Sequence, residues 1–214
     1  MSQAIIRKYR KDDRSAVRAI AWETAFMGEP ASAFFASRET LVSFLTMYFT
    51  DYEPQSCFVA EAEGKVVGYL IGAKNVEVLE RVFKEEIFWP LLAKALMRGE
   101  SLILKNLKFG FFSLRSLVRN ELAMPDFSRE YPATLHINLA QGWRGQGIGS
   151  QLISAYFEYL RREHVPGVSL ATISEQATDF FTRKGFALLH QGWRSYFRNI
   201  LHRDIPIYIY GKKF

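Results

Sequence analysis

One short stretch of the chain combines a basic side chain with repeated glycines. Residues 141–150 read QGWRGQGIGS, in which Arg144 is followed by three alternating glycines. The stretch stands between an apolar run, residues 133–140, and a helix-period pattern that begins at Ile148. A glycine-rich turn at a helix N-terminus binds anions, because the first-turn N–H groups lack partners and the helix dipole is positive there. We therefore expect this turn to bind a phosphate group, most simply a pyrophosphate.

Three kinds of phosphate loop can be compared with this stretch. A P-loop needs a Lys-Ser or Lys-Thr pair after its last glycine, and none is present. A dinucleotide fingerprint needs GxGxxG with an acidic residue ending the next strand, and residues 168–173, VSLATI, contain no acid. What remains is R-x-x-G-x-G, from Arg144 to Gly149. This pattern resembles the acyl-CoA pyrophosphate loop of the GNAT superfamily of N-acyltransferases.

The surrounding patterns predict which elements position this loop. Residues 12–26 and 37–49 have helical periods, residues 56–73 predict a β-hairpin around Glu63 and Gly64, and residues 74–132 predict two or more helices. Further helices are expected at 147–163 and 174–185, and further strands at 4–10, 133–140, 168–173, 186–191 and 205–210. The alternation of strands and helices after residue 133 predicts parallel pairing of the strands.

The resemblance extends beyond the loop. The order of elements is similar to the GNAT fold across nearly the whole chain, and residues 177–186, ATDFFTRKGF, resemble the helix of that family that ends in a Gly-Phe turn. The resemblance implies an α/β fold with a mixed central sheet of about six to seven strands, flanked by helices, in which strands four and five splay apart. Residues 1–214 would form one domain, with a helical insertion at about 75–131 that could cover an acceptor site.

The resemblance also implies a set of cofactor contacts. Acetyl-CoA, or another acyl-CoA, would be the co-substrate, and no metal is expected. Backbone groups of Asn138, Leu139 and Ala140 would contact the pantetheine arm, and the Leu139 N–H would be the donor to the thioester oxyanion. Ser174 and Phe181 would contact the cofactor from the following helix. The residues expected to hold the pyrophosphate are Arg144, Gly145, Gln146, Gly147, Ile148, Gly149 and Ser150.

Two positions depart from the family pattern. Phe181 stands where the family often has a tyrosine that protonates the leaving thiolate, and Ser174 stands where it often has an asparagine. Phenylalanine has no proton to give, and Tyr196, Tyr208 or a water could substitute as the acid, which helps the thiolate to leave but need not be decisive. The departures leave two hypotheses open: an N-acetyltransferase acting on a primary amine in a ternary complex, and a non-catalytic acyl-CoA sensor of the same fold.

His136 is the main candidate for a general base. In the strand 133–140, His136 and Asn138 alternate with apolar residues, so both lie on one face and indicate a polar cleft or buried water. A histidine titrates in the useful range. The alternatives are a hydrogen-bonded structural histidine, or Glu130 or Asp126 acting through a water. The acidic turn at 51–53 predicts either an amine-attracting group or exposed charges at a helix exit.

The composition bears on the location of the protein and on the class of its partners. The chain has 214 residues, 49% of them hydrophobic, and one cysteine, so no intrachain disulfide can form and a cytoplasmic location is expected. No apolar run reaches the length of a membrane span, and the charged residues 1–13 lack the apolar h-region of a signal peptide, so none is expected there. No nucleic-acid-binding motif is present, so the expected partner is a small-molecule or peptide amine.

The net charge of +6 is unevenly distributed. Basic residues crowd the C-terminus and the segment 98–119, where Glu100 is the only acid. Within that segment LKFGFFSLRSL, residues 107–117, is apolar on one side and basic on the other. An acceptor-pocket wall, a membrane-surface patch, a homodimer contact and ordinary core packing are all compatible with this pattern.

Overall fold

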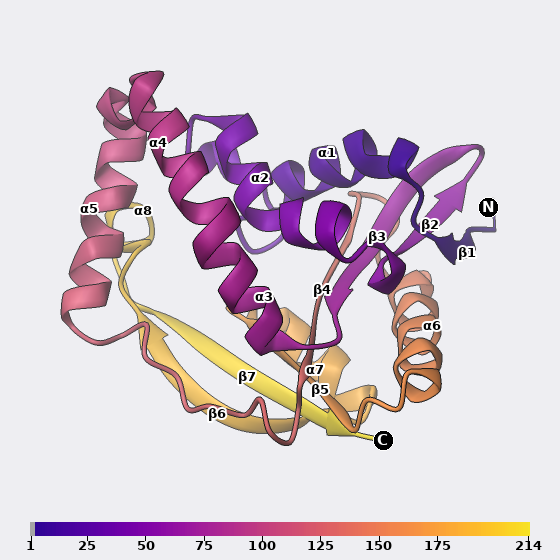
Figure 1. Ribbon diagram of the computed structural model, residues 1–214. Helices are drawn as coiled ribbons and strands as arrows, with labels where there is room; N and C mark the ends of the chain where they lie inside the picture. The colour runs from indigo at the N-terminus through magenta and orange to yellow at the C-terminus, as the bar shows by residue number, and fades with distance from the viewer. Residues whose placement is uncertain (1–2) are drawn as a thin grey trace.

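The computed structural model describes residues 3–214, and within them the strands form one seven-stranded sheet (Figure 1). The strand order is β1-β2-β3-β4-β5-β7-β6, and β4–β5 is the one parallel pair. A mixed sheet flanked by helices is the predicted fold class, which is thereby confirmed. The strands are β1 (Ile5–Lys8), β2 (Phe58–Ala62), β3 (Lys65–Ala73), β4 (Ala133–Leu139), β5 (Gly167–Thr172), β6 (Ala187–Arg194) and β7 (Ile205–Lys213).

The expectation of parallel pairing after residue 133 is right for β4 and β5 and wrong for the last strands. The last strand, β7, lies between β5 and β6 and is antiparallel to both. β5 and β6 therefore run in the same direction without being neighbours. Local periodicity identifies strands but does not show that a later segment will enter the sheet between two earlier ones.

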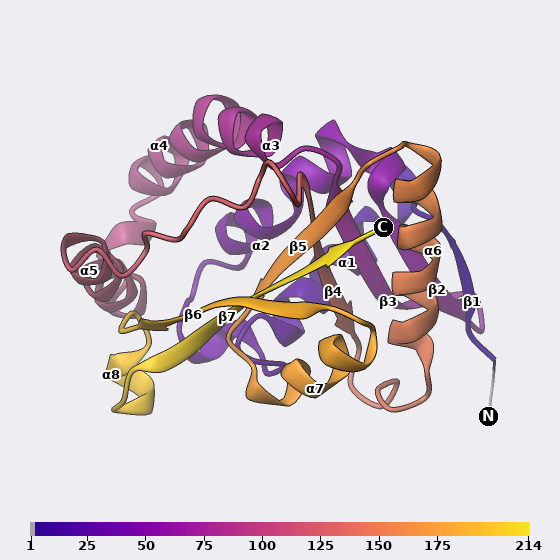
Figure 2. The ribbon, with the colours of Figure 1, turned by 90° about the horizontal axis from the view of Figure 1, so that it is seen from below.

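Helices cover both faces of the sheet (Figure 2). The helices α1 and α2 lie on one face, over an apolar cluster that includes Val17, Tyr69 and Ile71. On the other face α6 and α7 bury a larger cluster that includes Leu135 and Leu152. The helices are α1 (Arg14–Thr24), α2 (Arg38–Met47), α3 (Val76–Val82), α4 (Trp89–Met97), α5 (Leu104–Val118), α6 (Ile148–Arg162), α7 (Glu175–Arg183) and α8 (Arg198–Leu201).

Tyr156 fixes α6 to the two central strands. Its side chain is fully buried, and its hydroxyl lies 2.9 Å from the carbonyl oxygen of Thr134 in β4 and 3.2 Å from that of Ala73 in β3. Gly72 makes this approach possible, because a Cβ there would lie 2.3 Å from the Tyr156 hydroxyl. The contact positions the N-terminal end of β4 relative to the helix that follows the glycine loop.

Tyr156→Phe is expected to destabilise the protein by about 1 kcal/mol, because it removes a buried hydroxyl shared between two carbonyl groups. In a chain of this size that corresponds to a melting temperature lower by about 2–4 °C. Calorimetry measures the change, with Tyr52→Phe as an exposed control that should change the melting temperature less. An unchanged melting temperature for Tyr156→Phe would contradict the bracing role.

Candidate functional site

The central feature of the site is a gap between β4 and β5. The two strands pair in register only at Ala133 with Val168 and at Thr134 with Ser169. Beyond these pairs β4 runs on to Leu139 and stays paired with β3, while β5 stays paired with β7. The facing edges of the two strands are thus unpaired toward their C-terminal ends, and this is the predicted splaying of strands four and five.

The backbone of β4 offers alternate residues to this gap. The Ala140 N–H donates to the Val67 carbonyl at 2.9 Å, and the next pair along the antiparallel register is Leu139 with Gly68. Hydrogen-bonded and non-hydrogen-bonded pairs alternate along such a ladder. Leu139 and Ile137 therefore turn their N–H and C=O groups away from β3 and toward the gap, whereas the backbone groups of Asn138 and Ala140 face β3.

The glycine loop is open on the side where a side chain would otherwise project. Gly142, Gly145 and Gly147 all have positive φ angles, of 88°, 76° and 78°. A Cβ added at any of the three would meet no atom within 4 Å. Gly147 is the N-cap of α6, so the amides of Ile148 and Gly149, the first two residues of the helix, lie beside this open space, whereas the Ser150 amide donates to the Gly147 carbonyl at 3.0 Å. The loop has the form of an anion cradle.

Side chains of the loop hold it in place. The Arg144 guanidinium donates to the Gly28 carbonyl at 2.8 Å, which joins the loop to the connection between α1 and α2. A Cβ at Gly28, whose φ is 95°, would lie 2.9 Å from that guanidinium and would require it to shift. Gln146 donates its side-chain amide to the Gly142 carbonyl at 2.8 Å. The cradle is thus preformed by contacts that the sequence pattern alone did not reveal.

The helix after β5 packs closely against the loop. A Cβ at Gly149 would lie 3.2 Å from the Phe180 ring and 3.7 Å from Ile137, so glycine allows α6, α7 and β4 to meet. Phe181 is buried in the core, with its ring centroid 5.7 Å from that of Phe186. Ser174 is the N-cap residue of α7 and stands two residues after the end of β5.

The structure separates the two tyrosines that could replace the missing acid. Tyr208 is in register with Thr172, the last residue of β5, and so lies at the end of the sheet where the gap is open. Tyr196 packs instead against Phe109 and Phe197, in a cluster beside α5 and α8. Burial raises the pKa of Tyr196.

His136 lies on the face of β4 that α1 and α2 cover. Its ring is exposed to solvent, and the Phe49 ring stands edge-on to it with centroids 5.4 Å apart. Desolvation nevertheless lowers the pKa of His136 from its ordinary value of 6.5. The imidazole is therefore neutral at neutral pH and able to accept a proton.

Glu130 and Asp126, the two carboxylates considered as alternatives to His136, have partners elsewhere. Glu130 forms an ion pair with Lys213, next to the C-terminus. Asp126 accepts a hydrogen bond from the Ser128 N–H at 2.8 Å within its own loop. Both are groups on the connection between α5 and β4, and neither is brought to His136 by the contacts found.

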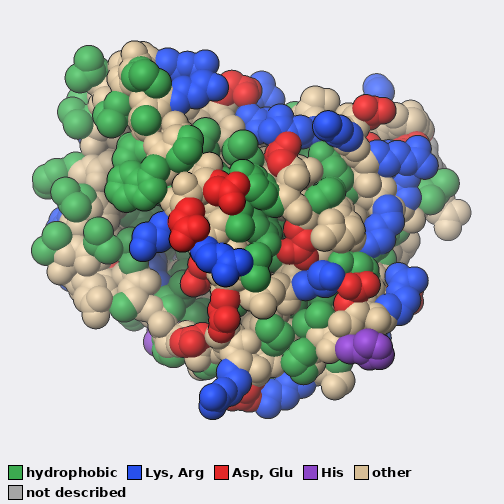
Figure 3. Space-filling view, viewed as in Figure 1, with side chains coloured by type: hydrophobic (Ala, Val, Ile, Leu, Met, Phe, Trp, Pro, Cys, Tyr) green, Lys and Arg blue, Asp and Glu red, His purple; other side chains and the backbone are tan. Residues whose placement is uncertain are grey.

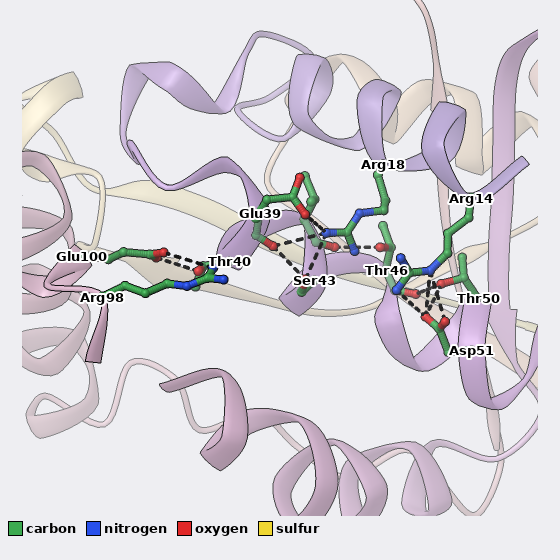
Figure 4. Close-up of polar contacts among 11 residues, drawn as sticks. Arg14, Arg18, Glu39, Thr40, Ser43, Thr46, Thr50, Asp51, Arg98 and Glu100 are labelled. Atoms are coloured by element: carbon green, nitrogen blue, oxygen red, sulfur yellow. Dashed lines mark hydrogen bonds and ion pairs between the residues drawn. The ribbon is translucent and has the colours of Figure 1, made fainter. Parts of the chain in front are cut away.

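Asp51 and Glu53, the acids of the turn at 51–53, form contacts with neighbouring elements of the protein. Asp51 forms an ion pair with Arg14 of α1 at 3.1 Å (Figure 4). Glu53 is buried and accepts hydrogen bonds from the Tyr48 hydroxyl and the Lys74 N–H. These residues fix the exit of α2 to its neighbours. Among residues 3–214 no group of three or more His, Cys, Asp or Glu side chains is arranged to hold a metal ion.

Comparison with known proteins agrees with this geometry. Residues 118–186 match the family model described as the acetyltransferase (GNAT) family. The crystal structure of SsHAT has a TM-score of 0.71 at 23% identity, over 99% of this chain and 98% of that one. A Drosophila melanogaster polyamine N-acetyltransferase that forms N-acetylagmatine has a TM-score of 0.62 at 15% identity, over 99% of this chain and 100% of that one.

A third structure bears on the co-substrate. The putative acetyltransferase yncA from Salmonella typhimurium, solved with its cofactor acetyl-CoA, has a TM-score of 0.55 at 13% identity, over 99% of this chain and 94% of that one. At these identities the structures show a shared fold. The family match covers the segment that holds β4, the glycine loop, α6 and α7, so this part of the chain is similar to the acetyltransferase (GNAT) family.

Proposed function

We propose that this protein is an N-acetyltransferase that moves an acetyl or other acyl group from acyl-CoA to a primary amine by direct attack in a ternary complex. One observation carries the proposal: β4 and β5 part at the end of the sheet where the Leu139 amide faces the gap and the glycine loop opens. The Leu139 N–H, the gap between β4 and β5 and the glycine loop thus lie at the same end of the sheet.

The groups of this chain have distinct roles in the proposal. Bound acetyl-CoA supplies an activated acyl group. The amides at the start of α6 and the loop held by Arg144 bind the diphosphate. The Leu139 N–H donates to the acyl carbonyl oxygen, where negative charge develops. One donor of this kind accounts for about 10²–10³ in rate.

His136 removes the proton from the attacking amine. An alkylammonium has a reference pKa of about 10.4, so a proton must leave before or during attack. Because desolvation keeps His136 neutral, its ring accepts this proton directly or through one water. Phe49 stands edge-on to the ring.

An acid on the leaving group is helpful but not essential. A thiol has a reference pKa of about 8.5, so the thiolate is a fair leaving group near neutral pH. Phe181 cannot give a proton and is packed in the core. Tyr208 is better placed than Tyr196 to supply one, since it lies opposite the last residue of β5.

The experiment is a steady-state assay of CoA-thiol release over a panel of amines. The polyamine and agmatine acetyltransferases of this fold make small cationic amines the first acceptors to test, followed by amino acids and peptides. Turnover on any amine is the expected result. Tight acetyl-CoA binding without turnover on any amine would favour the second candidate, a non-catalytic sensor, which Phe181 motivates. Absence of acetyl-CoA binding would contradict both.

A further inference from the structure

The helix α5 turns two polar side chains inward beside Phe109, which packs against Phe34 and Phe197, and it leaves most of its other apolar side chains exposed. Asn106 and Ser116 point inward and are 7% and 0% exposed. The Asn106 side chain bonds to Ala36, Ser37 and the Glu100 carbonyl at 2.8 Å each, and Ser116 bonds to Ser195 and Glu121. A surface helix normally buries its apolar stripe instead.

The outward face of the same helix is a continuous apolar stripe. Its residues follow a spacing of three and four, which places them along one side of a helix. All are more than half exposed: Leu104, Leu107, Phe111, Leu114 and Val118. The α4–α5 apolar patch is the name used below for this set together with four exposed residues that precede it, Trp89, Leu96, Met97 and Leu102.

The turn between α4 and α5 extends the patch to the tip of the molecule. Met97 and Leu102 are 82% and 83% exposed, among the highest values for large apolar side chains. Trp89 and Leu96 on α4 are also more than half exposed. Hydrophobic side chains gather on this side of the protein in the space-filling view, over the tip formed by α4 and α5 (Figure 3). Exposed apolar surface on this scale marks a place of contact.

The charges of this segment are nearly all of one sign. Residues 89–119 contain six basic residues and one acid, a net +5, in a protein whose net charge is +6. Lys108 and Arg115 of α5 and Arg119 just after it are seven and four residues apart, which places them in a row beside the apolar stripe.

The one acid of the segment is turned away from this surface. Glu100 accepts a hydrogen bond from the Thr40 hydroxyl of α2 at 2.6 Å, and its side chain is 15% exposed (Figure 4). Arg98 stays 52% exposed beside it. Arg98 is paired with Glu100 at 3.9 Å and Arg119 with Glu121 at 2.9 Å, so the outer surface of the patch combines apolar side chains with the positive charges of Lys108 and Arg115.

We propose that the α4–α5 apolar patch binds an anionic lipid membrane surface, with the tip and the stripe entering the interface and the basic row contacting lipid phosphates. Among residues 3–214 no helix is long and apolar enough to cross a bilayer, so the contact is peripheral. Apolar side chains next to Lys and Arg are the pattern of helices that lie in a membrane interface.

Charge disfavours a second copy of the chain as the occupant. An antiparallel pairing of two such stripes would place Lys108 and Arg115 of one copy beside the same residues of the other, which repel. The acidic surface that such a pair would need is missing, because Glu100 is already bound to α2.

The test is co-sedimentation of the full chain with vesicles of phosphatidylcholine alone and of phosphatidylcholine mixed with phosphatidylserine. Binding to the mixed vesicles only, weakened by added salt, is expected. Met97→Ser with Leu102→Ser, and separately Lys108→Glu with Arg115→Glu, should each lower the partition coefficient at least about tenfold. The matched controls are Ile5→Ser on the edge strand and Lys65→Glu at the hairpin, both exposed, which should bind as the unchanged protein does.

Several outcomes would overturn the proposal. One is no binding to phosphatidylserine vesicles. Another is equal binding by the patch variants and their controls. A third is a stable dimer by analytical ultracentrifugation that the Met97 and Leu102 substitutions dissociate, which would assign the patch to a second copy. Circular dichroism of each variant separates loss of binding from loss of folding. None of these readouts depends on acetyl transfer, so the proposal stands or fails separately from the proposed function.

Discussion

Gly147→Asp is expected to weaken acetyl-CoA binding by at least about 100-fold while the protein remains folded. Gly147 is the N-cap of α6, and the space beside its missing side chain is empty. A carboxylate there would occupy the position proposed for the pyrophosphate, and like charges a few ångströms apart in a partly desolvated site repel by several kcal/mol.

The fold should tolerate this change for two reasons. Aspartate is among the preferred N-cap residues, and with asparagine it is one of the few residues that adopt the left-handed conformation which φ of 78° requires. Gly147→Asn is the matched control, because it adds almost the same bulk without the charge. Isothermal titration with acetyl-CoA should give a much smaller loss for asparagine. Equal affinities for the aspartate variant and the unchanged protein would show that the loop does not hold the pyrophosphate.

His136→Gln is expected to lower kcat by about 10²–10⁴ and to leave the KM for acetyl-CoA nearly unchanged, because general base catalysis is lost and the loop is untouched. The pH profile gives the more specific readout. Protonation disables the base, so activity falls as the pH drops through the lowered pKa of His136, and this acid limb lies below pH 6.5. The limb should be missing from the glutamine variant.

Two substitutions serve as controls for His136. Glu130→Gln and Asp126→Asn remove the other carboxylates considered as bases, and both should keep kcat within about threefold of the unchanged enzyme, since their partners lie elsewhere. A low-pKa amine acceptor keeps the ionisation of the substrate apart from that of the enzyme. If His136→Gln keeps its acid limb, or if Glu130→Gln loses most of the activity, the base is wrongly assigned.

The sequence predicted the parts of this protein that depend on local pattern. Glycines after a buried strand, the helix from Ile148 and the hairpin at Glu63 each have a local signature, and all occur as expected. The place of β7 between β5 and β6 had no such signature, because it depends on contacts between segments distant in the chain. The short helix α8 was also missed.

The candidate site was predictable to a similar extent. Period-two alternation identified His136 and Asn138 as sharing a face, and the same alternation applied to backbone groups could have shown that Ile137 and Leu139 face the gap. The bond from Arg144 to Gly28 joins residues far apart in the sequence and could not be read from either segment. The exposure of the apolar stripe of α5 could not be predicted for a related reason, because an amphipathic pattern does not show which side of a helix is turned inward.

A crystal structure of the protein with acetyl-CoA and a non-reactive amine analogue tests the central claim most directly. We predict the pyrophosphate on the amides that open α6, the pantetheine arm between β4 and β5, and the acyl carbonyl oxygen within hydrogen-bonding distance of the Leu139 N–H. The account is contradicted if the cofactor lies outside the gap, or if the Leu139 amide makes no contact with the acyl group.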